Sequence, residues 1–285
     1  MLEGVLSERK VITVEVLPPR GPNLPEFLDK VSSYGSVFDG FNVPELVMRR
    51  ENEAWINTFY VAVRMRERGL LAIPHMTCRE HTRRSAISHI LMGISGEVED
   101  ILVVRGDSLG IYSKEVFELD TIGMIKLVIS TYLRFSGRKP TILVAADPNA
   151  PDLDDEIRRT LEKLEAGGEI VQTQPVFNMD KFEEFVEGVK RERPEVKILG
   201  GVLLLSDPRT VERLKKVVGL PIPEEVTDRL ISSEDPLSEG TFMAEELSSS
   251  IIDVCDGVHM FPMGRLDVAA EVAKRIRRSV SVRIK

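Results

Sequence analysis

The chain has 285 residues, of which 42% are hydrophobic and 29% are charged, a composition typical of a folded globule of one or two domains. It contains no run of about 18 apolar residues, and its first residues lack the basic end and apolar centre of a secretory signal. The net charge is -8, and Lys and Arg are spread singly rather than gathered in the basic stripe that binds nucleic acid. We therefore expect a cytoplasmic protein without a membrane or nucleic-acid partner.

Cysteine and glutamine are both rare. The two cysteines, Cys78 and Cys255, exclude a disulfide scaffold and a Cys-rich zinc or iron-sulfur site. Glutamine occurs at Gln172 and Gln174, whereas Glu, Lys and Arg are abundant. This balance is typical of heat-adapted proteins and predicts a thermophilic source.

Short β-branched runs recur along the whole chain, and each is followed by a segment with apolar residues at helical spacing. The predicted strands are residues 11–17, 37–43, 70–75, 100–105, 141–146, 169–174, 197–205 and 257–261. The predicted helices include residues 52–68, 82–94, 154–166, 181–191 and 208–218. Residues 220–250 break this rhythm with three prolines and further helical pattern.

Eight apolar strands alternating with helices indicate parallel strands buried on both faces. The repeat count and the length predict an α/β fold of the (β/α)8 TIM-barrel type, with residues 1–285 forming one catalytic domain. We interpret residues 220–250 as an extra helical insertion before strand eight. An open, doubly wound sheet is the alternative, but the first strand is not followed by the Gly-x-Gly-x-x-Gly motif of a dinucleotide-binding sheet.

The carboxyl ends of the strands are the informative positions, because the active site of such a barrel collects there. They carry unusually many polar residues. In chain order these are Glu15, Asn42, His75 with Thr77, Arg105-Gly106-Asp107, Asp147, Gln174, Ser206 and His259, with Arg265 just beyond.

Two of these ends suggest specific chemistry. Apolar neighbours would desolvate an inward Glu15 carboxyl and raise its pKa towards that of a general acid; a rim carboxylate paired with an arginine is an equal alternative. Gly106 would let a flat ligand or a phosphate approach the backbone. Beside it, Arg105 could bind the phosphate and Asp107 could accept a ring N–H, the alternative being an Arg–Asp pair at a tight turn.

The histidine-rich third strand end resembles a zinc site in spacing. His75, Cys78 and His81 stand three residues apart, but a fourth ligand is lacking and three ligands on one turn rarely complete a tetrahedron. We predict no metal and expect a neutral His75 to hydrogen-bond a ligand, with a capped loop histidine as the alternative. His81 and His89 are expected on a solvated helix surface, and Trp55 is expected to pack within the second helix.

Gln174 ends the sixth predicted strand. An inward amide offers both a donor and an acceptor to a heterocycle. An amide in a barrel layer, bonded to a side chain of a neighbouring strand, is an equally weighted alternative.

These strand ends also form a series of short motifs in one order along nearly the whole chain. They are Val-Glu-Val-Leu-Pro-Pro at 14–19, Pro-His-Met-Thr-Cys at 74–78, Val-Arg-Gly-Asp at 104–107, Ala-Gly-Gly at 166–168, Thr-Gln-Pro-Val-Phe at 173–177, Gly-Gly-Val at 200–202 and Gly-Val-His at 257–259 with Arg265. Each motif alone is weak evidence. Together and in this order, the motifs resemble those of the methylenetetrahydrofolate reductase family.

The resemblance implies a flavin-containing barrel that reduces 5,10-methylenetetrahydrofolate, or a related methylene-pterin, to the 5-methyl form with NAD(P)H. This reaction belongs to one-carbon metabolism and methionine biosynthesis, and the family suggests a homo-oligomer. By motif position, Glu15 and Asp107 would be catalytic, and Gln174, Asp107 and Arg265 would bind the substrate. The positions implied for FAD are Asn42, His75, Arg105, Gly106, Asp107, Asp147 and Lys163.

Two strand ends depart from the family pattern. The sequence Asn-Val-Pro at 42–44 replaces Thr-Tyr-Gly, and Ala-Asp-Pro-Asn-Ala at 146–150 replaces Ala-Tyr-Pro-Glu and a following His. A flavin-lacking homologue that acts as a partner subunit is therefore one alternative. A lyase or transferase that uses Glu15 and Asp107 as an acid–base pair is another.

Overall fold

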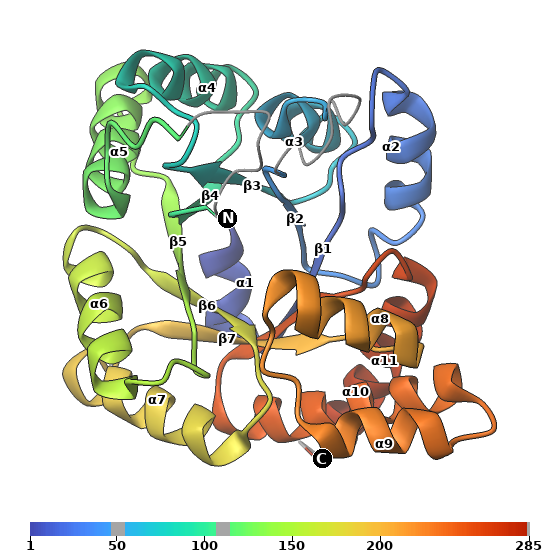
Figure 1. Cartoon of the computed structure of the whole chain (residues 1–285). Coiled ribbons are helices and arrows are strands. Elements are labelled where there is room, and N and C mark those ends of the chain that lie inside the picture. The colour runs from blue at the N-terminus through green and yellow to red at the C-terminus, as the bar shows by residue number, and fades with distance from the viewer. Residues whose placement is uncertain (47–54, 107–114, 284–285) are drawn as a thin grey trace.

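Eight parallel strands close into a barrel in the computed structural model, which describes residues 1–46, 55–106 and 115–283 (Figure 1). Each strand pairs with the next, and β8 pairs with β1. The strands are β1 (Val11–Glu15), β2 (Gly40–Val43), β3 (Ala72–Thr77), β4 (Asp100–Val104), β5 (Thr141–Ala146), β6 (Ile170–Pro175), β7 (Lys197–Leu203) and β8 (Gly257–Phe261). The predicted (β/α)8 fold is confirmed.

Helices surround this barrel and follow the strands in turn. They are α2 (Leu24–Ser32), α3 (Thr58–Arg66), α4 (Arg83–Ser95), α5 (Thr121–Ser136), α6 (Leu153–Glu165), α7 (Met179–Glu192), α8 (Pro208–Arg213) and α11 (Leu266–Arg283). Most begin at a side chain that accepts a backbone N–H of the first turn, which replaces a missing helical hydrogen bond. These capping residues include Asn57, Thr82, Asp120, Asp152, Asn178 and Asp207.

Two predicted elements begin three or more residues before the observed ones. The second strand starts at Gly40 rather than at residue 37, because Val37 and Phe38 are buried in the turn that precedes it. The helix predicted from residue 52 starts at Thr58, after the Asn57 cap. Trp55 is therefore not helical; it forms an isolated antiparallel bridge with Arg20. In the strand, burial of apolar side chains outside regular structure produced the misleading pattern.

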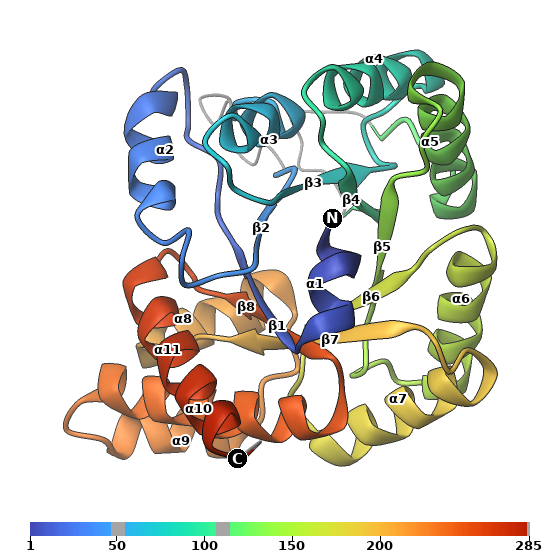
Figure 2. The same ribbon diagram turned by 180° about the vertical axis from the view of Figure 1, so that it is seen from behind.

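The amino-terminal end of the barrel is closed by α1 (Leu2–Glu8), a helix that was not predicted. Figure 2 shows this helix in front of the ring of strands. Leu2 and Leu6 pack on the apolar side chains that line this end, namely Val11, Ile73, Leu102, Leu143, Ile170 and Leu199. The backbone N–H of Leu2 also donates to Asp100 Oδ1 at 2.8 Å. The carboxyl end of the barrel is thus the end left for a ligand.

Side chains inside the barrel stack in layers contributed by alternate strands, as in other TIM barrels. Two layers follow from the registers of the strand pairs. The even-numbered strands contribute Asn42, Leu102, Gln172 and His259, and the odd-numbered strands contribute Glu15, His75, Ala145 and Gly201 to the next layer towards the carboxyl end. The interior thus changes from apolar at α1 to polar near the opposite end.

The predicted helical insertion before β8 is also confirmed. After α8 the chain forms a short π-helix (Leu214–Val218), α9 (Glu224–Ser232) and α10 (Pro236–Val254). Gly240 of α10 lies against the backbone that follows β7, where a Cβ would stand 1.6 Å from the Leu205 oxygen. Within the described ranges, no helix has the length and apolar character needed to cross a membrane.

Candidate active site at the carboxyl ends of the strands

An amide pair crosses the interior of the barrel. The Nδ2 group of Asn42 on β2 donates to Gln172 Oε1 on β6 at 2.8 Å, and it lies 3.3 Å from His75 Nε2 on β3. Asn42 and Gln172 are both buried. The buried Asn42 Oδ1 has no hydrogen-bond partner among the described residues. A series of polar contacts from Gln172 on β6 through Asn42 on β2 to His75 on β3 therefore lies directly below the mouth of the barrel.

His259 occupies the same layer as this amide pair. Its Nδ1 lies 2.9 Å from Thr13 Oγ1, and its ring meets the edge of Phe261 with centroids 4.6 Å apart. Burial, reinforced by the nearby His75, lowers the pKa of His259 well below its ordinary value. The ring is thus neutral, and its buried Nε2 is also without a partner in the described part of the chain.

His75 stands in the layer above and is half-buried. Burial lowers its pKa from 6.5 to about 4, although the Glu45 carboxylate opposes this shift. His75 therefore carries no charge at neutral pH. The charge state matches the neutral histidine expected at the third strand end, and its hydrogen bond to a ligand stays a prediction.

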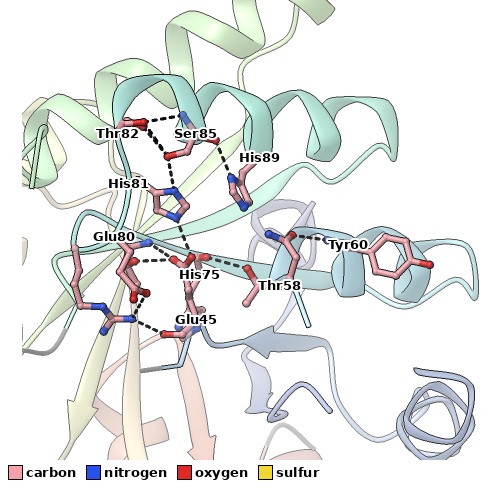
Figure 3. Close-up of polar contacts among 12 residues, drawn as sticks. Glu45, Thr58, Tyr60, His75, Glu80, His81, Thr82, Ser85 and His89 are labelled. Carbon is pink, nitrogen blue, oxygen red and sulfur yellow. Dashed lines mark hydrogen bonds and ion pairs between the residues drawn. The ribbon is translucent and has the colours of Figure 1, made fainter. Parts of the chain in front are cut away.

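Glu45, just after β2, ties the second strand end to the third, as Figure 3 shows. Its Oε2 accepts from Thr77 N at 2.9 Å and from Thr77 Oγ1 at 2.7 Å, while Oε1 lies 2.8 Å from His81 Nε2. Burial acts to raise the pKa of Glu45, but the hydrogen bonds and charge interaction with His81 and the hydrogen bonds from Thr77 outweigh it and lower that pKa. His81 Nδ1 in turn lies 3.2 Å from Ser85 Oγ.

The expectation that His81 lies on a solvated surface was wrong, because the side chain is buried between Glu45 and Ser85. His89 is half-buried rather than solvated; its ring packs edge-on to those of His81 and Phe59. Sequence reasoning also missed Glu45. Nothing in the spacing marks a glutamate two residues beyond a short strand as the partner of a histidine 36 positions away.

The fourth strand end holds Arg105 and Gly106 at the rim. Arg105 is exposed, and its guanidinium lies 5.2 Å from the centre of the Phe117 ring. Gly106 has a φ of +87°, and a Cβ there would stand 3.0 Å from Arg79 Cβ and 3.2 Å from Thr77 Cβ. Glycine is thus required by both backbone conformation and space. Asp107, predicted as a catalytic residue, lies outside the described residues.

The fifth strand end is held by local hydrogen bonds. Asp147 Oδ1 accepts from Asn149 N and from Asn149 Nδ2, each at 2.9 Å, and Asn149 Nδ2 also donates to Pro175 O on β6 at 2.8 Å. Asp147 N donates to Glu156 Oε1 on α6 at 3.2 Å. Asp147 is therefore at the mouth, in a loop tied to its neighbours.

Lys163 has a different environment from the other predicted site residues. Its ammonium donates to Ala145 O at 2.7 Å and lies 3.7 Å from Glu156 Oε1. Burial lowers its pKa, although Glu156 opposes this. These contacts place Lys163 between α6 and the outer side of β5. The structure does not bring it to the side chains of the barrel interior.

The remaining predicted residues lie at the mouth in different settings. Glu15 is half-buried at the end of β1, in register with Asn42. Gln174 is exposed, beyond an irregularity in the pairing of β6 with β7. Arg265 lies in the turn after β8, with its guanidinium 2.9 Å from an Asp267 carboxylate oxygen. Glu15, Asn42, His75, Arg105, Gly106, Asp147 and Gln174 thus share one end of the barrel.

Gln172 is the interior residue that sequence reasoning passed over. Its signal was present, since it stands two positions before Gln174 on the same strand, and residues two apart face the same side of a strand. The alternative of a glutamine bonded within a barrel layer describes Gln172, not the exposed Gln174.

The three residues with zinc-like spacing do not converge on a common point. His75 contacts Asn42 and His81 contacts Glu45, while the buried Cys78 thiol has its pKa raised to about 11 by burial. In the portion of the chain that the structure covers, no three His, Cys, Asp or Glu side chains are arranged to hold a metal ion.

Comparison with known sequences identifies one family. The profile of the family described as "Methylenetetrahydrofolate reductase" matches residues 2–277. The chain is 24% identical over 296 residues to a probable methylenetetrahydrofolate reductase (NADPH) of Caenorhabditis elegans, a match that covers 96% of this chain and 43% of that protein. It is 24% identical over 222 residues to the 5,10-methylenetetrahydrofolate reductase of Salmonella typhimurium, covering 74% of this chain and 70% of that enzyme. The chain thus spans less than half the length of the nematode relative.

Comparison with solved structures supports the same fold. An uncharacterized protein from Clostridium thermocellum, described as binding two copies of 5-methyl-5,6,7,8-tetrahydrofolic acid, superposes with a TM-score of 0.73 at 17% identity over 98% of this chain and 99% of that one. EDTA monooxygenase from Chelativorans superposes with a TM-score of 0.55 at 10% identity, over 96% of this chain and 94% of that one. At these identities the likeness concerns the barrel architecture.

Proposed function

Because the chain belongs to the methylenetetrahydrofolate reductase family, we propose that it reduces a 5,10-methylene-pterin of the folate type to the 5-methyl form, with NAD(P)H as the hydride donor and a bound FAD. The observation that carries the proposal is the polar mouth, where Glu15 and His75 share one layer above the buried Asn42. On the same family grounds we propose that residues 1–285 form one catalytic domain of a cytoplasmic homo-oligomer.

The side chains at the mouth fit a flavin. Gly106, with a φ of +87°, turns the chain at the rim beside Thr77 and Arg79, and it has no side chain that would cover its own backbone from a planar ring or a phosphate. The half-buried His75 and the exposed Arg105 would hold it, with Asn42 and Asp147 beside them. When bound, the flavin would accept a hydride from NAD(P)H and pass it to the pterin.

Glu15 is the proposed general acid. It would hold a proton at its carboxyl oxygen and give it to the pterin nitrogen that leaves as the methylene-bridged ring opens. The exposed Gln174 amide would donate to and accept from the pterin. Asp107 and Arg265 complete the proposed substrate contacts.

An absorption spectrum tests the proposal. The purified protein, or the protein after incubation with FAD, should show oxidised-flavin bands that NADH or NADPH bleaches and the methylene-pterin restores. A protein that takes up no flavin would contradict the proposal.

The Glu15→Gln variant separates the two half-reactions. Bleaching by NAD(P)H should remain, while reoxidation by the methylene-pterin should slow about 100-fold, the usual size of a general-acid effect. Stopped-flow absorbance measures both rates. An equal loss in both half-reactions would show that Glu15 is structural instead.

A second candidate is a folate-binding barrel without flavin. The departures at residues 42–44 and 146–150 favour it, as does the structural relative from Clostridium thermocellum that is described as binding 5-methyl-tetrahydrofolic acid. A colourless protein that binds 5-methyl-tetrahydrofolate in calorimetry would select this candidate.

A further inference from the structure

Contacts inside the barrel determine which ring nitrogen of His75 carries its proton. We propose that Gln172, acting through Asn42, holds His75 in the tautomer protonated at Nδ1, so that this N–H donates to an acceptor atom of the ligand in the mouth. In this role Gln172 is a positioning residue that touches no ligand. The identity of the ligand rests on the proposed function, whereas the tautomer does not.

The first step concerns the Asn42 amide. Nδ2 is the nitrogen of that amide and carries two hydrogens. One hydrogen is donated to Gln172 Oε1, which lies 2.8 Å from Nδ2. The other is available to His75 Nε2, which lies 3.3 Å from Nδ2. Because Asn42 donates to it, Nε2 must present its lone pair.

The second step concerns the charge of the ring. With a pKa of about 4, His75 is neutral at physiological pH and has one ring proton. Since Nε2 accepts, the proton is on Nδ1. That nitrogen has no hydrogen-bond partner among the residues the structure describes, and the side chain is half-buried rather than enclosed. It is therefore available as a donor at the mouth.

The third step compares the opposite arrangement. If both side-chain amides were flipped, so that their oxygen and nitrogen atoms exchanged places, Gln172 would donate to Asn42 Oδ1. His75 Nε2–H would then donate to the same oxygen. The Asn42 NH2 group would then occupy the place where Oδ1 now lies without a partner. Buried N–H groups without partners are rarer in proteins than under-satisfied carbonyl oxygens. The present arrangement, with one oxygen left over, is therefore preferred.

The ligand chemistry follows from this tautomer. A neutral histidine with Nδ1–H facing the mouth recognises a carbonyl oxygen or a ring nitrogen with a free lone pair. The other tautomer would present a lone pair and repel the same atoms. Gln172 thus contributes to specificity from the far side of the barrel, two positions below the exposed Gln174.

Nuclear magnetic resonance of protein labelled with 15N in histidine tests the tautomer directly. The chain has four histidines, and the His75→Gln variant assigns the relevant signals. We expect His75 protonated at Nδ1 in the wild type. In Gln172→Met, which removes the acceptor while keeping the side-chain length, we expect a substantial Nε2-protonated population. The control Gln172→Glu keeps an acceptor oxygen and should keep the wild-type tautomer.

Thermal unfolding shows whether each variant is folded before its spectrum is interpreted. A wild-type His75 protonated at Nε2, or a Gln172→Met variant with an unchanged tautomer, would overturn the proposal. FAD serves as the ligand probe: its dissociation constant should rise about 10-fold in Gln172→Met and stay near the wild-type value in Gln172→Glu. Failure of the wild type to bind FAD would count against the proposed function, and the tautomer spectrum would still decide the role of Gln172.

Discussion

Gln172 and Gln174 show how two residues of one type on one strand acquire different tasks. Gln172 is buried, and its amide oxygen is committed to Asn42. Gln174 is exposed at the mouth, beyond the irregular pairing of β6 with β7. Gly201 permits this irregularity, because a Cβ there would stand 2.5 Å from Gln174 O. The inner amide is bonded within the barrel interior, and the outer one is the substrate contact that we propose.

At this same residue scale, Gln174→Ala should weaken pterin binding without loss of flavin. Removing one hydrogen-bonding amide from a ligand contact costs about 1 to 2 kcal/mol, or about a 10-fold higher dissociation constant. Calorimetric titration with 5-methyl-tetrahydrofolate measures the affinity, and the flavin absorbance measures cofactor content. A variant purified without flavin would show that Gln174 supports the cofactor instead.

At the scale of elements, the insertion is held to the barrel by a backbone contact. Gly240 brings α10 so close to the segment after β7 that a Cβ would overlap the Leu205 oxygen, at 1.6 Å. The neighbouring cavity of about 270 Å³ is lined mainly by apolar residues of β7, α9 and α10, together with Val176 and Phe177. The position of α10 thus shapes one side of the region beside the mouth.

Gly240→Ala should therefore destabilise the fold. The added methyl group must push α10 away from a rigid carbonyl, and such overpacking costs about 1 to 3 kcal/mol. Urea denaturation measures the free energy of unfolding. Gly4→Ala in α1 is the matched control, since nothing lies within 4 Å of a Cβ at that position, and it should be neutral or stabilising by up to about 1 kcal/mol. Equal effects of the two substitutions would contradict this picture of α10.

At the scale of the whole molecule, buried titratable groups make stability depend on pH. The pKa of His75 is lowered from 6.5 to about 4. The contribution of the neutral ring to the free energy of unfolding is therefore full above pH 6.5, and it is lost as the pH falls towards 4. Linkage gives a loss of about 2 kcal/mol by pH 5. His75→Gln should lose less stability than the wild type between pH 7.5 and pH 5, as measured by urea denaturation. The same loss in both proteins would rule out His75 as a source.

Asp100, under α1, acts in the opposite direction. Burial raises its pKa from 3.8 to about 6, although the hydrogen bond from Leu2 N opposes the shift. The contribution of the protonated Asp100 carboxyl to the free energy of unfolding is full below about pH 4, and it is lost as the pH rises through 6. Asp100→Asn should therefore make the loss of stability on acidification steeper by about 1 kcal/mol. A shallower loss in this variant would contradict the assignment.

Apolar spacing and strand-end composition were enough to predict the barrel, the insertion and most of the mouth. Strands buried on both faces have nearly continuous apolar sequences, and the constant direction of the chain in a (β/α)8 barrel brings every strand's carboxyl end to one side. Glu15, Asn42, His75 and Gln174 could thus be placed together without coordinates.

The partners of individual side chains were decided by tertiary structure. The stagger between strands sets Gln172 opposite Asn42, chain folding after β2 brings Glu45 to His81, and the Lys163 ammonium binds Ala145 although its position matches a cofactor motif. A sequence period of two or 3.6 residues tells which side of an element is buried. It does not contain the relative shift of distant strands or the direction of a long side chain, and these quantities determine which polar atoms meet.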